Sequence, residues 1–415
     1  MRLKFDWVTI VLYAVLVIYG WVNIYAACYS EDHAFVFDFS VQHGKQLIWI
    51  GAAALLAFIV LYTEPRVFSD TAYIIYGIVL FLLLVTLVVA RAVNGGKSWI
   101  DLGPFKFQPS EFAKFATALA MAKYVGGVDA KLHSTKGRII TISMILVPAA
   151  LVLLQHDTGS ALVFAAFVIP LFREGLTKYV LILTGLAITL FVLTLVVNQY
   201  IVMGILLAGC LIYLFIWLNH RNRKAYIGTA TFFVLACLFV FSVDFAFEKV
   251  LEPHQRERID VLLGKTQDFK GVGYNVHQSK IAIGSGGAFG KGFLKGTITK
   301  ADFVPEQETD FIFCTVGEEG GFLGSSILVA LYVTLIMRII FLAERQRSVF
   351  SRFYGYSVAS IFFFHFLVNI GMVLGLVPVI GIPLPFFSYG GSSLIAFTLL
   401  LFIFIKQDTY RTQLL

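Results

Sequence analysis

Long apolar runs dominate the sequence and limit it to a membrane-spanning fold. Hydrophobic residues make up 59% of the chain and charged residues 14%, and apolar stretches recur from the first run at Trp7–Ala27 onward. A run of about 20 apolar residues can cross the hydrocarbon core of a bilayer as a helix. Because a helix satisfies its own backbone groups in lipid, we expect an all-α polytopic membrane protein.

Windows of this length predict about twelve transmembrane helices, an even number that places both termini on one side. The spans are expected near Trp7–Ala27, Leu47–Thr63, Ala72–Ala90, Pro109–Tyr124, Ile139–Leu154, Gly159–Phe172, Tyr179–Val197, Val202–Leu218, Tyr226–Val243, Asp310–Leu342, Phe353–Leu376 and Phe386–Ile405. The first run has the flanks of a signal peptide but is too long for one, so we expect an uncleaved helix.

The basic residues of the short loops indicate the orientation. They gather in alternate loops, for example at 131–138, 221–224 and 345–352. The positive-inside rule then places both termini in the cytoplasm, with the long loop 244–309 and Asp310 outside. The same rule accounts for the net charge of +7 without nucleic acid as a partner.

Acidic residues stand where the tenth predicted span begins. Asp310 ends a polar stretch, and Glu318 and Glu319 follow inside the apolar run. Burying an ionised carboxylate costs several kcal/mol unless it is paired or used, so these residues are candidates for function. The alternative is that Asp310 only caps the helix, since Asp is a favoured N-cap residue.

A second polar cluster starts the predicted helix Pro109–Tyr124. Pro109 suits a first helical turn, and Glu111 and Lys114 are three residues apart on one face, where they can pair. Ordinary capping and charge neutralisation would explain the pair. The functional interpretation rests on Lys114 lying one turn inside a membrane segment, near the surface where Asp310 is expected.

The long loop 244–309 contains a glycine-rich core. Its glycines are Gly284, Gly286, Gly287, Gly290 and Gly292. Glycine permits positive φ and a close backbone approach to a ligand, so one interpretation is a phosphate cradle. The spacing matches neither known phosphate-binding fingerprint. We therefore favour a loop that folds back onto the helices.

Two further turns are expected on the same side. The sequence from Gln155 to Gly159 contains His156 and Asp157, but turn chemistry explains it without a ligand. The segment Pro378–Ser393 holds three prolines and a run of small polar residues, which is typical of irregular backbone that lines a cavity.

Topology thus gathers a carboxylate and several cations at the outer face. The cations are Lys97, Lys114, Arg256, Arg258 and Lys280. Such a set suits a substrate with a lipid tail, an anionic phosphate linker and a polar head. The four cysteines match no metal-binding spacing, so the residues themselves indicate no cofactor.

Five segments together resemble the SEDS family (shape, elongation, division and sporulation proteins), and its RodA branch more than its FtsW branch. They are SWIDLGPFKFQPSEFAKF, QHDTGSA, YNVHQSKIAIGSGGAFGKGFLKG, PEQETDFIFCTVGEEGGFLG and PFFSYGGSS. The resemblance implies one integral membrane domain over 1–415, with a core of ten helices. Residues 202–243 would then be an inserted helix pair.

This resemblance also implies a function. Members polymerise lipid II into glycan strands at the outer face of the bacterial cytoplasmic membrane, beside a class B penicillin-binding protein. The family's essential acid maps to Asp310. Residues implied in substrate binding are Lys114, Glu111, Lys280, Gln278, Ser279, Arg256, Arg258, Trp99 and Lys97. A divalent cation, Mg²⁺ or Mn²⁺, is possible by resemblance.

The chain departs from the family's pattern at three places. Glu308 stands where members usually have His, and Ser98 stands where many have Arg, with Lys97 as its substitute. The third departure is His156, in place of the Pro of a Gln-Pro-Asp turn.

Two other functions stay open at this point. A lipid flippase would need polar groups near the midplane that are reached from both faces. A non-catalytic scaffold for a penicillin-binding protein would not need Asp310 or Lys114.

Overall fold

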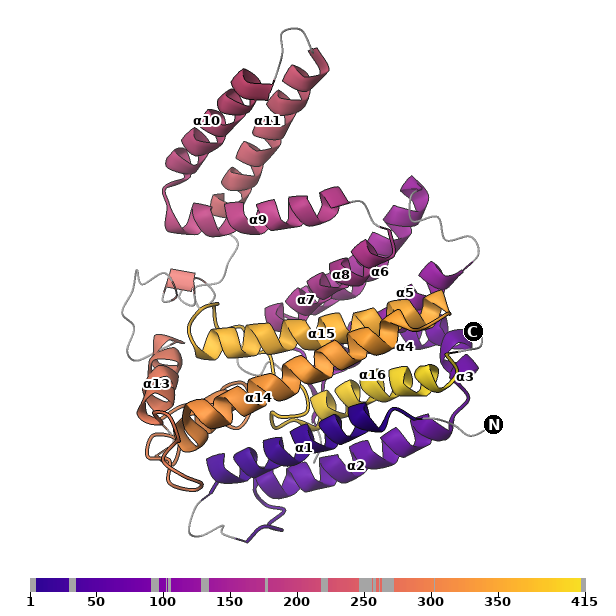
Figure 1. Cartoon of the computed structure of the whole chain (residues 1–415), viewed down its shortest axis with the longest axis vertical. Coiled ribbons are helices and arrows are strands. Elements are labelled where there is room, and N and C mark those ends of the chain that lie inside the picture. The colour runs from indigo at the N-terminus through magenta and orange to yellow at the C-terminus, as the bar shows by residue number, and fades with distance from the viewer. Residues whose placement is uncertain are drawn as a thin grey trace. The chain divides into compact units, whose positions relative to one another are not determined.

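The structure is a computed structural model of the chain, built almost entirely of helices (Figure 1). It describes residues 5–29, 35–90, 97–101, 103, 106–127, 134–175, 178–217, 223–245, 256, 259–260, 262, 272–301 and 303–411. The chain forms two compact units, one of residues 1–176 with 274–415 and one of residues 177–273. Each unit is described by itself.

The larger unit contains most of the helices. They are α1 (Trp7–Ala27), α2 (Gln42–Tyr62), α3 (Pro65–Asp70), α4 (Ala72–Val89), α5 (Pro109–Gly126), α6 (Thr135–Leu154), α7 (Thr158–Val163), the 3-10 helix η2 (Phe164–Phe167), α8 (Val168–Arg173), α13 (Val272–Ser285), α14 (Ile312–Glu344), α15 (Val349–Val373) and α16 (Gly391–Thr409). Strands β1 (Ile100–Asp101) and β2 (Lys106–Phe107) form a small antiparallel ribbon before α5.

Helix α15 lies at the centre of the larger unit. It packs on α14, α5 and α16, while α1 covers α14 and α2 covers α16. In the most apolar 18-residue stretch of each helix, 72% of the residues of α15 and 78% of those of α16 are buried, against 22% for α4. Outer helices such as α4 thus turn apolar side chains outward, as expected of surfaces that face lipid, whereas polar side chains collect around α15.

The prediction of an all-α polytopic membrane protein is confirmed. Within the described residues, eight helices are long and apolar enough to cross a membrane: α1, α2, α4, α6, α11, α14, α15 and α16. A helix or helical run lies at each of the other predicted spans, but α5 is more polar and the run 158–173 is shorter. The count of twelve therefore stays a prediction.

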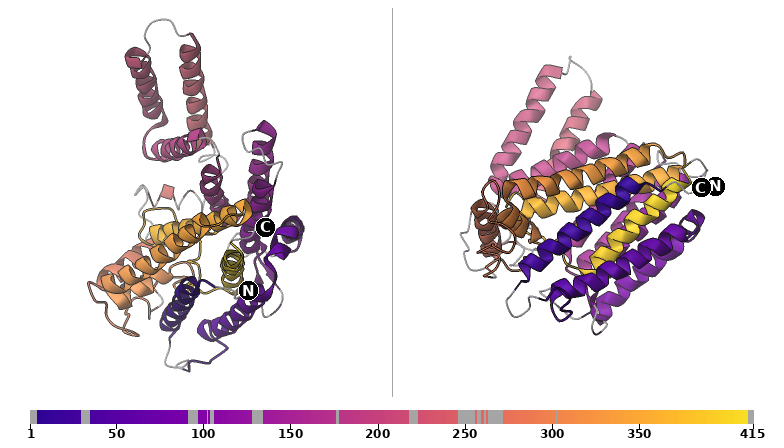
Figure 2. Two further views of the ribbon diagram at one scale, coloured as in Figure 1. Left: turned by 45° about the vertical axis from the view of Figure 1, so that its right-hand side comes forward. Right: turned by 60° about the horizontal axis from the view of Figure 1, so that its bottom comes forward.

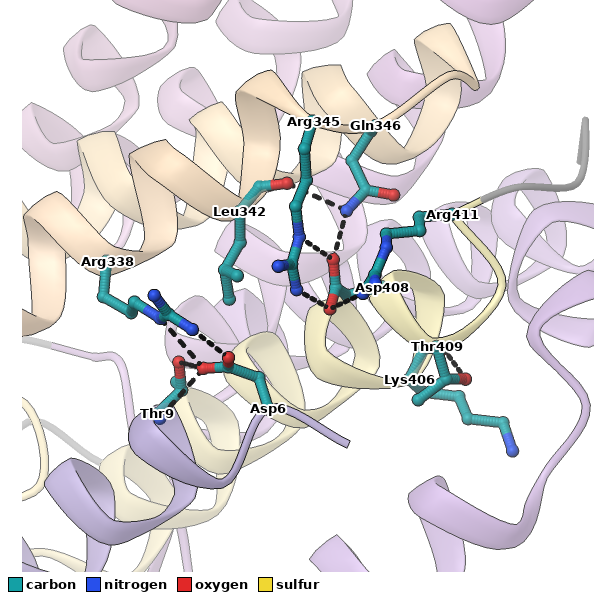
Figure 3. Close-up of polar contacts among 10 residues, drawn as sticks. All are labelled: Asp6, Thr9, Arg338, Leu342, Arg345, Gln346, Lys406, Asp408, Thr409 and Arg411. Atoms are coloured by element: carbon teal, nitrogen blue, oxygen red, sulfur yellow. Dashed lines mark hydrogen bonds and ion pairs between the residues drawn. The ribbon is translucent and has the colours of Figure 1, made fainter. Parts of the chain in front are cut away.

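Ion pairs join the two ends of the larger unit's chain near the end of α14 (Figure 3). Asp6 caps α1 through Thr9 and pairs with Arg338 of α14. Asp408 of α16 pairs with Arg345, just beyond α14. Helix α14 runs from Ile312 to Glu344 with a non-helical residue at Gly321, so its start and these ion pairs lie at opposite ends of it. Figures 1 and 2 accordingly show both marked termini at one end, opposite the start of α14.

The smaller unit contains α9 (Lys178–Val196), α10 (Gln199–Trp217) and α11 (Arg223–Phe245). These three helices share a small apolar core that includes Leu190, Val202 and Val240. The interpretations of 1–415 as one membrane domain and of 202–243 as an inserted pair stay predictions. Of the predicted loop 244–309, residues 246–255 and most of 257–271 lie outside the described residues.

Candidate functional site

Asp310 lies between two segments that fix its main chain and its carboxylate. Helix α14 begins at Ile312 with Phe311 in the N-cap position, so Asp310 precedes the cap. The Asn369 side-chain amide donates to the carbonyl oxygens of Asp310, at 2.9 Å, and Ile382, at 2.7 Å. A Cβ atom at Gly381 would lie 3.2 Å from Asp310 Oδ2. The half-buried carboxylate is thus placed against the 381–382 backbone.

A cavity of about 860 Å³ adjoins this position and reaches Thr309. It is lined by Phe39, Ser40, Val41, Gln42, Lys45, Ile48, Trp49, Trp99, Lys106, Thr309, Tyr389, Gly390 and Gly391. Two exposed lysines and four large aromatic side chains line it. Ammonium groups suit phosphate oxygens, and aromatic rings with a few polar groups are typical walls of a ligand site.

Glu308 lines a second cavity beside this one. Gln42 donates to Glu308 Oε1 at 2.8 Å, and the Tyr389 N–H donates to the Glu308 carbonyl at 2.9 Å. The second cavity, of about 460 Å³, is lined by Glu308 and Lys300 and shares Val41 and Gln42 with the first. Glu308, which stands where family members usually have His, therefore forms part of the wall of the second cavity.

Tyr389 keeps its proton in the wall of the larger cavity. Burial raises the pKa of its phenol, and the neighbouring Cys28 and Glu308 act in the same direction. A protonated phenol can donate a hydrogen bond to a ligand oxygen.

Glu111 and Lys114 lie in a closed polar cluster under the site. The Lys114 ammonium is 2.7 Å from Glu111 Oε1 and 3.0 Å from His365 Nε2, and it lies 5.0 Å from the centre of the Phe397 ring. Lys114 is 1% exposed and Glu111 2%. Since His365 and Asn369 are four residues apart on α15, the cluster lies one helical turn from the contacts of Asp310.

The two predicted binding residues before α5 lie apart from this cluster. Trp99 lines the larger cavity. Lys97 is exposed, and its backbone N–H donates to the Gln155 carbonyl at 2.8 Å.

Helix α13 carries three of the predicted binding residues. Ser279 is buried and donates to the Val373 carbonyl at 2.9 Å, which joins α13 to the end of α15. The Lys280 ammonium lies beside Gly375, and Gln278 is half-buried. Arg256 belongs to the smaller unit, and Arg258 lies outside the described residues.

The glycine-rich loop binds a carboxylate of its own chain. Glu318 accepts hydrogen bonds from the backbone N–H groups of residues 297–299, at 2.8 to 3.0 Å, and pairs with Lys291 at 2.6 Å. A Cβ at Gly286 or Gly290 would come within 2.0 Å of an α14 carbonyl oxygen. The loop therefore folds back onto α14, and Glu318 fastens it there. This close approach explains Gly286 and Gly290 without a phosphate.

Asp157 has the structural role expected of a turn. It caps α7 through the Ser160 N–H at 2.9 Å and accepts from the Gln108 side chain at 3.0 Å. His156 beside it is exposed.

The sequence analysis missed the polar face of α2. Gln42, Lys45, Gln46 and Trp49 follow one another at helical spacing, and Gln46 accepts from the Gly390 N–H at 3.3 Å. Polar residues at intervals of three and four in an apolar span were the available signal. His365 was also missed, because one histidine in an apolar helix gives no pattern.

The chain resembles known proteins over most of its length. A sequence model of the cell cycle protein family of FtsW, RodA and SpoVE matches residues 6–206 and 173–413. The peptidoglycan glycosyltransferase MrdB of Escherichia coli (strain K12) is 36% identical over 350 residues, which cover 84% of this chain and 81% of that protein. The peptidoglycan glycosyltransferase RodA of Treponema pallidum (strain Nichols) is 32% identical over 415 residues, with 94% of both chains covered.

Two solved structures share the fold. One belongs to a study of how a peptidoglycan synthase complex coordinates polymerization and crosslinking; its chain is 30% identical, with a TM-score of 0.71 and coverage of 99% of this chain and 100% of that one. The other is the rod shape determining protein RodA of Thermus thermophilus, 27% identical, with a TM-score of 0.64 and 99% of both chains covered.

Proposed function

Because the chain belongs to the FtsW, RodA and SpoVE family of cell cycle proteins, we propose that it is a peptidoglycan glycosyltransferase that polymerises lipid II during cell elongation. One observation carries the proposal for this chain. Asp310 directly follows Thr309, which lines a cavity of about 860 Å³ with lysine and aromatic walls, at the end of the helices opposite the termini. A carboxylate beside cations suits glycosyl transfer from a lipid diphosphate.

In the mechanism that we propose, Asp310 is the general base. An α-linked donor and a β-linked product require inversion, which one direct displacement achieves. The acceptor hydroxyl oxygen attacks the anomeric carbon and gives its proton to Asp310, while the bond from that carbon to the diphosphate oxygen breaks. Lys45 and Lys106 line the cavity and can stabilise the departing diphosphate, and Trp99 can support a sugar ring.

A divalent cation, Mg²⁺ or Mn²⁺, stays a proposal. The described residues hold no group of three or more His, Cys, Asp or Glu side chains that could bind a metal ion. Mg²⁺ in proteins is commonly held by one or two carboxylates together with substrate phosphates. The residues therefore fit a cation that arrives with the diphosphate, and no step depends on it.

The environment of the enzyme follows from the same family. We propose the cytoplasmic membrane of a bacterium, with both termini inside and Asp310 outside. A class B penicillin-binding protein would cross-link the strands, as polymerization and crosslinking are coordinated in the related synthase complex.

The test is glycan-strand formation from lipid II by the purified chain in detergent. The proposal predicts strands of many disaccharides, which muramidase digests to single units. A flippase would instead move lipid II across vesicles without lengthening it, and a scaffold would do neither. Absence of strands from a folded preparation, with and without the cross-linking partner, would refute the proposal.

A further inference from the structure

His365 lies at the centre of the buried cluster and contacts two elements. On α15 it is 1% exposed, its Nε2 is 3.0 Å from Lys114 Nζ, and its Nδ1 is 3.0 Å from the Pro383 carbonyl oxygen. An ammonium group donates and cannot accept, so Nε2 must be the acceptor. The proton then lies on Nδ1 and is donated to Pro383. One neutral tautomer satisfies both contacts.

The next turn of α15 continues the chain of contacts to Asp310. Asn369 donates to the carbonyl oxygens of Ile382 and Asp310. Thus α15 holds two consecutive carbonyl oxygens of one loop, of Ile382 and Pro383. The preceding residue, Gly381, is the one that lies against the Asp310 carboxylate. A shift of this loop would move the surface that orients the proposed base.

Lys114 belongs to the same cluster, where its side chain contacts three protein groups. Its ammonium contacts Glu111, His365 and the face of Phe397, and the side chain is almost fully buried. A buried ammonium that is paired and hydrogen-bonded is costly to withdraw from its partners. Of these three contacts, His365 is the one that links the Lys114 ammonium to the loop at Pro383.

We propose that His365 is a positioning residue for the transfer reaction. Its hydrogen bond with Lys114 fixes the imidazole ring beside the Glu111–Lys114 pair, and its hydrogen bond to the Pro383 carbonyl oxygen holds the loop. In this way His365 keeps the 381–383 backbone against Asp310. This inference rests on the proposed function, because it assigns His365 a role in the same site.

Two substitutions separate the polar role from simple packing. His365→Phe keeps a planar ring and removes both hydrogen bonds, whereas His365→Gln keeps one acceptor and one donor. We expect His365→Phe to lower kcat for lipid II about 10- to 100-fold with little change in KM, since small misplacements of reacting groups cost rates of this order. His365→Gln should recover most of the loss.

The matched control is Tyr354→Phe on the same helix. Tyr354 is fully buried, and its hydroxyl donates to the Leu400 carbonyl at 3.1 Å, eleven residues before His365. Loss of this hydrogen bond should lower the apparent Tm without lowering kcat. A His365→Phe enzyme with parental kcat would overturn the inference. So would a raised KM with unchanged kcat, which would indicate that Lys114 contacts substrate.

A spectroscopic readout on the parent protein is independent of catalysis. Nitrogen-15 NMR of the histidine-labelled parent, with the His365→Gln spectrum for assignment, should show Nδ1 protonated and Nε2 unprotonated at neutral pH. The opposite tautomer or a doubly protonated ring would contradict the arrangement. An inactive parent would refute the proposed function instead, and the NMR result would still decide the geometry.

Discussion

At the scale of single residues, Asn369 and Gly381 shape the immediate environment of Asp310. Asn369 fixes its carbonyl, and Gly381 approaches its carboxylate with φ +66°. Only glycine adopts that conformation at little cost, and any Cβ at this position would make a tight 3.2 Å contact with Asp310 Oδ2. Both the backbone conformation and the contact with Asp310 therefore favour glycine at position 381.

Gly381→Ala should reduce polymerisation while the protein remains folded. The new methyl group would strain the backbone and press on Asp310 Oδ2, so we expect kcat to fall on the order of tenfold or more. Steady-state kinetics with lipid II measure the effect. The control is Gly77→Ala in α4, where a Cβ meets nothing within 4 Å. Equal activity of the two variants would show that the approach of Gly381 to Asp310 is unimportant.

At the scale of elements, Glu318 determines where the glycine-rich loop lies. Its carboxylate accepts hydrogen bonds from three consecutive backbone N–H groups, as a bound phosphate would in a phosphate-binding loop. Gly321, with φ 63°, interrupts α14 just beyond it, and the loop's carbonyls pair with the N–H groups of Phe322 and Leu323. The loop and the start of α14 thus form one folded piece.

Glu318→Ala should release the loop from α14. Removing one partner leaves buried donors and Lys291 unsatisfied, at a cost on the order of 3 kcal/mol. Hydrogen exchange of the 297–299 amides should accelerate by the corresponding factor, about 100-fold. Glu64→Ala, an exposed carboxylate in another loop, should leave these amides protected. Unchanged protection in Glu318→Ala would mean that other contacts fasten the loop.

The stability contributed by the Asp6–Arg338 ion pair, which joins α1 to α14, should depend on pH. Burial opposes ionisation of Asp6, but hydrogen bonds from Arg338 and Thr9 outweigh it and lower the pKa of the carboxyl. Stability from this joint is then complete above the unfolded pKa of about 3.9 and is lost as pH falls through the lower folded pKa.

Asp6→Asn should accordingly lower the apparent Tm in detergent by several degrees at pH 7, and the difference from the parent should disappear as the pH falls through the lowered pKa of the folded-state carboxyl. Thermal scans across this range measure it. A difference that is constant with pH would indicate that the ionised carboxylate contributes nothing.

At the scale of the whole molecule, thiol labelling from each side of the membrane can test the predicted orientation, in which both termini are cytoplasmic. Phe289, 82% exposed, lies in the glycine-rich loop near the start of α14, and exposed Arg66 lies in α3. In a background without the four native cysteines, Phe289→Cys should react with an impermeant thiol reagent in intact spheroplasts. Arg66→Cys should react only after lysis. The reverse pattern would invert the orientation.

Periodicity and composition predicted the helices because each span is a local property of about 20 residues. The site's residue contacts could not be read in the same way. Lys114 and His365 are 251 positions apart, and Gln42 and Glu308 are 266 apart. The acidic residues at the start of the tenth predicted span made Asp310 a candidate, and the family resemblance implied its role, whereas Gln42 and His365 were found only once the helices were packed together.

The most direct test of the account is the rate of glycan polymerisation by Asp310→Asn, with Asp70→Asn as the control. Asp70 is 78% exposed and lies in α3, so the same chemical change there should leave the rate unaltered. Loss of a general base predicts a fall of about a hundredfold or more with lipid II binding retained. Polymerisation by purified Asp310→Asn at the parental rate would contradict the assignment of Asp310 as the base.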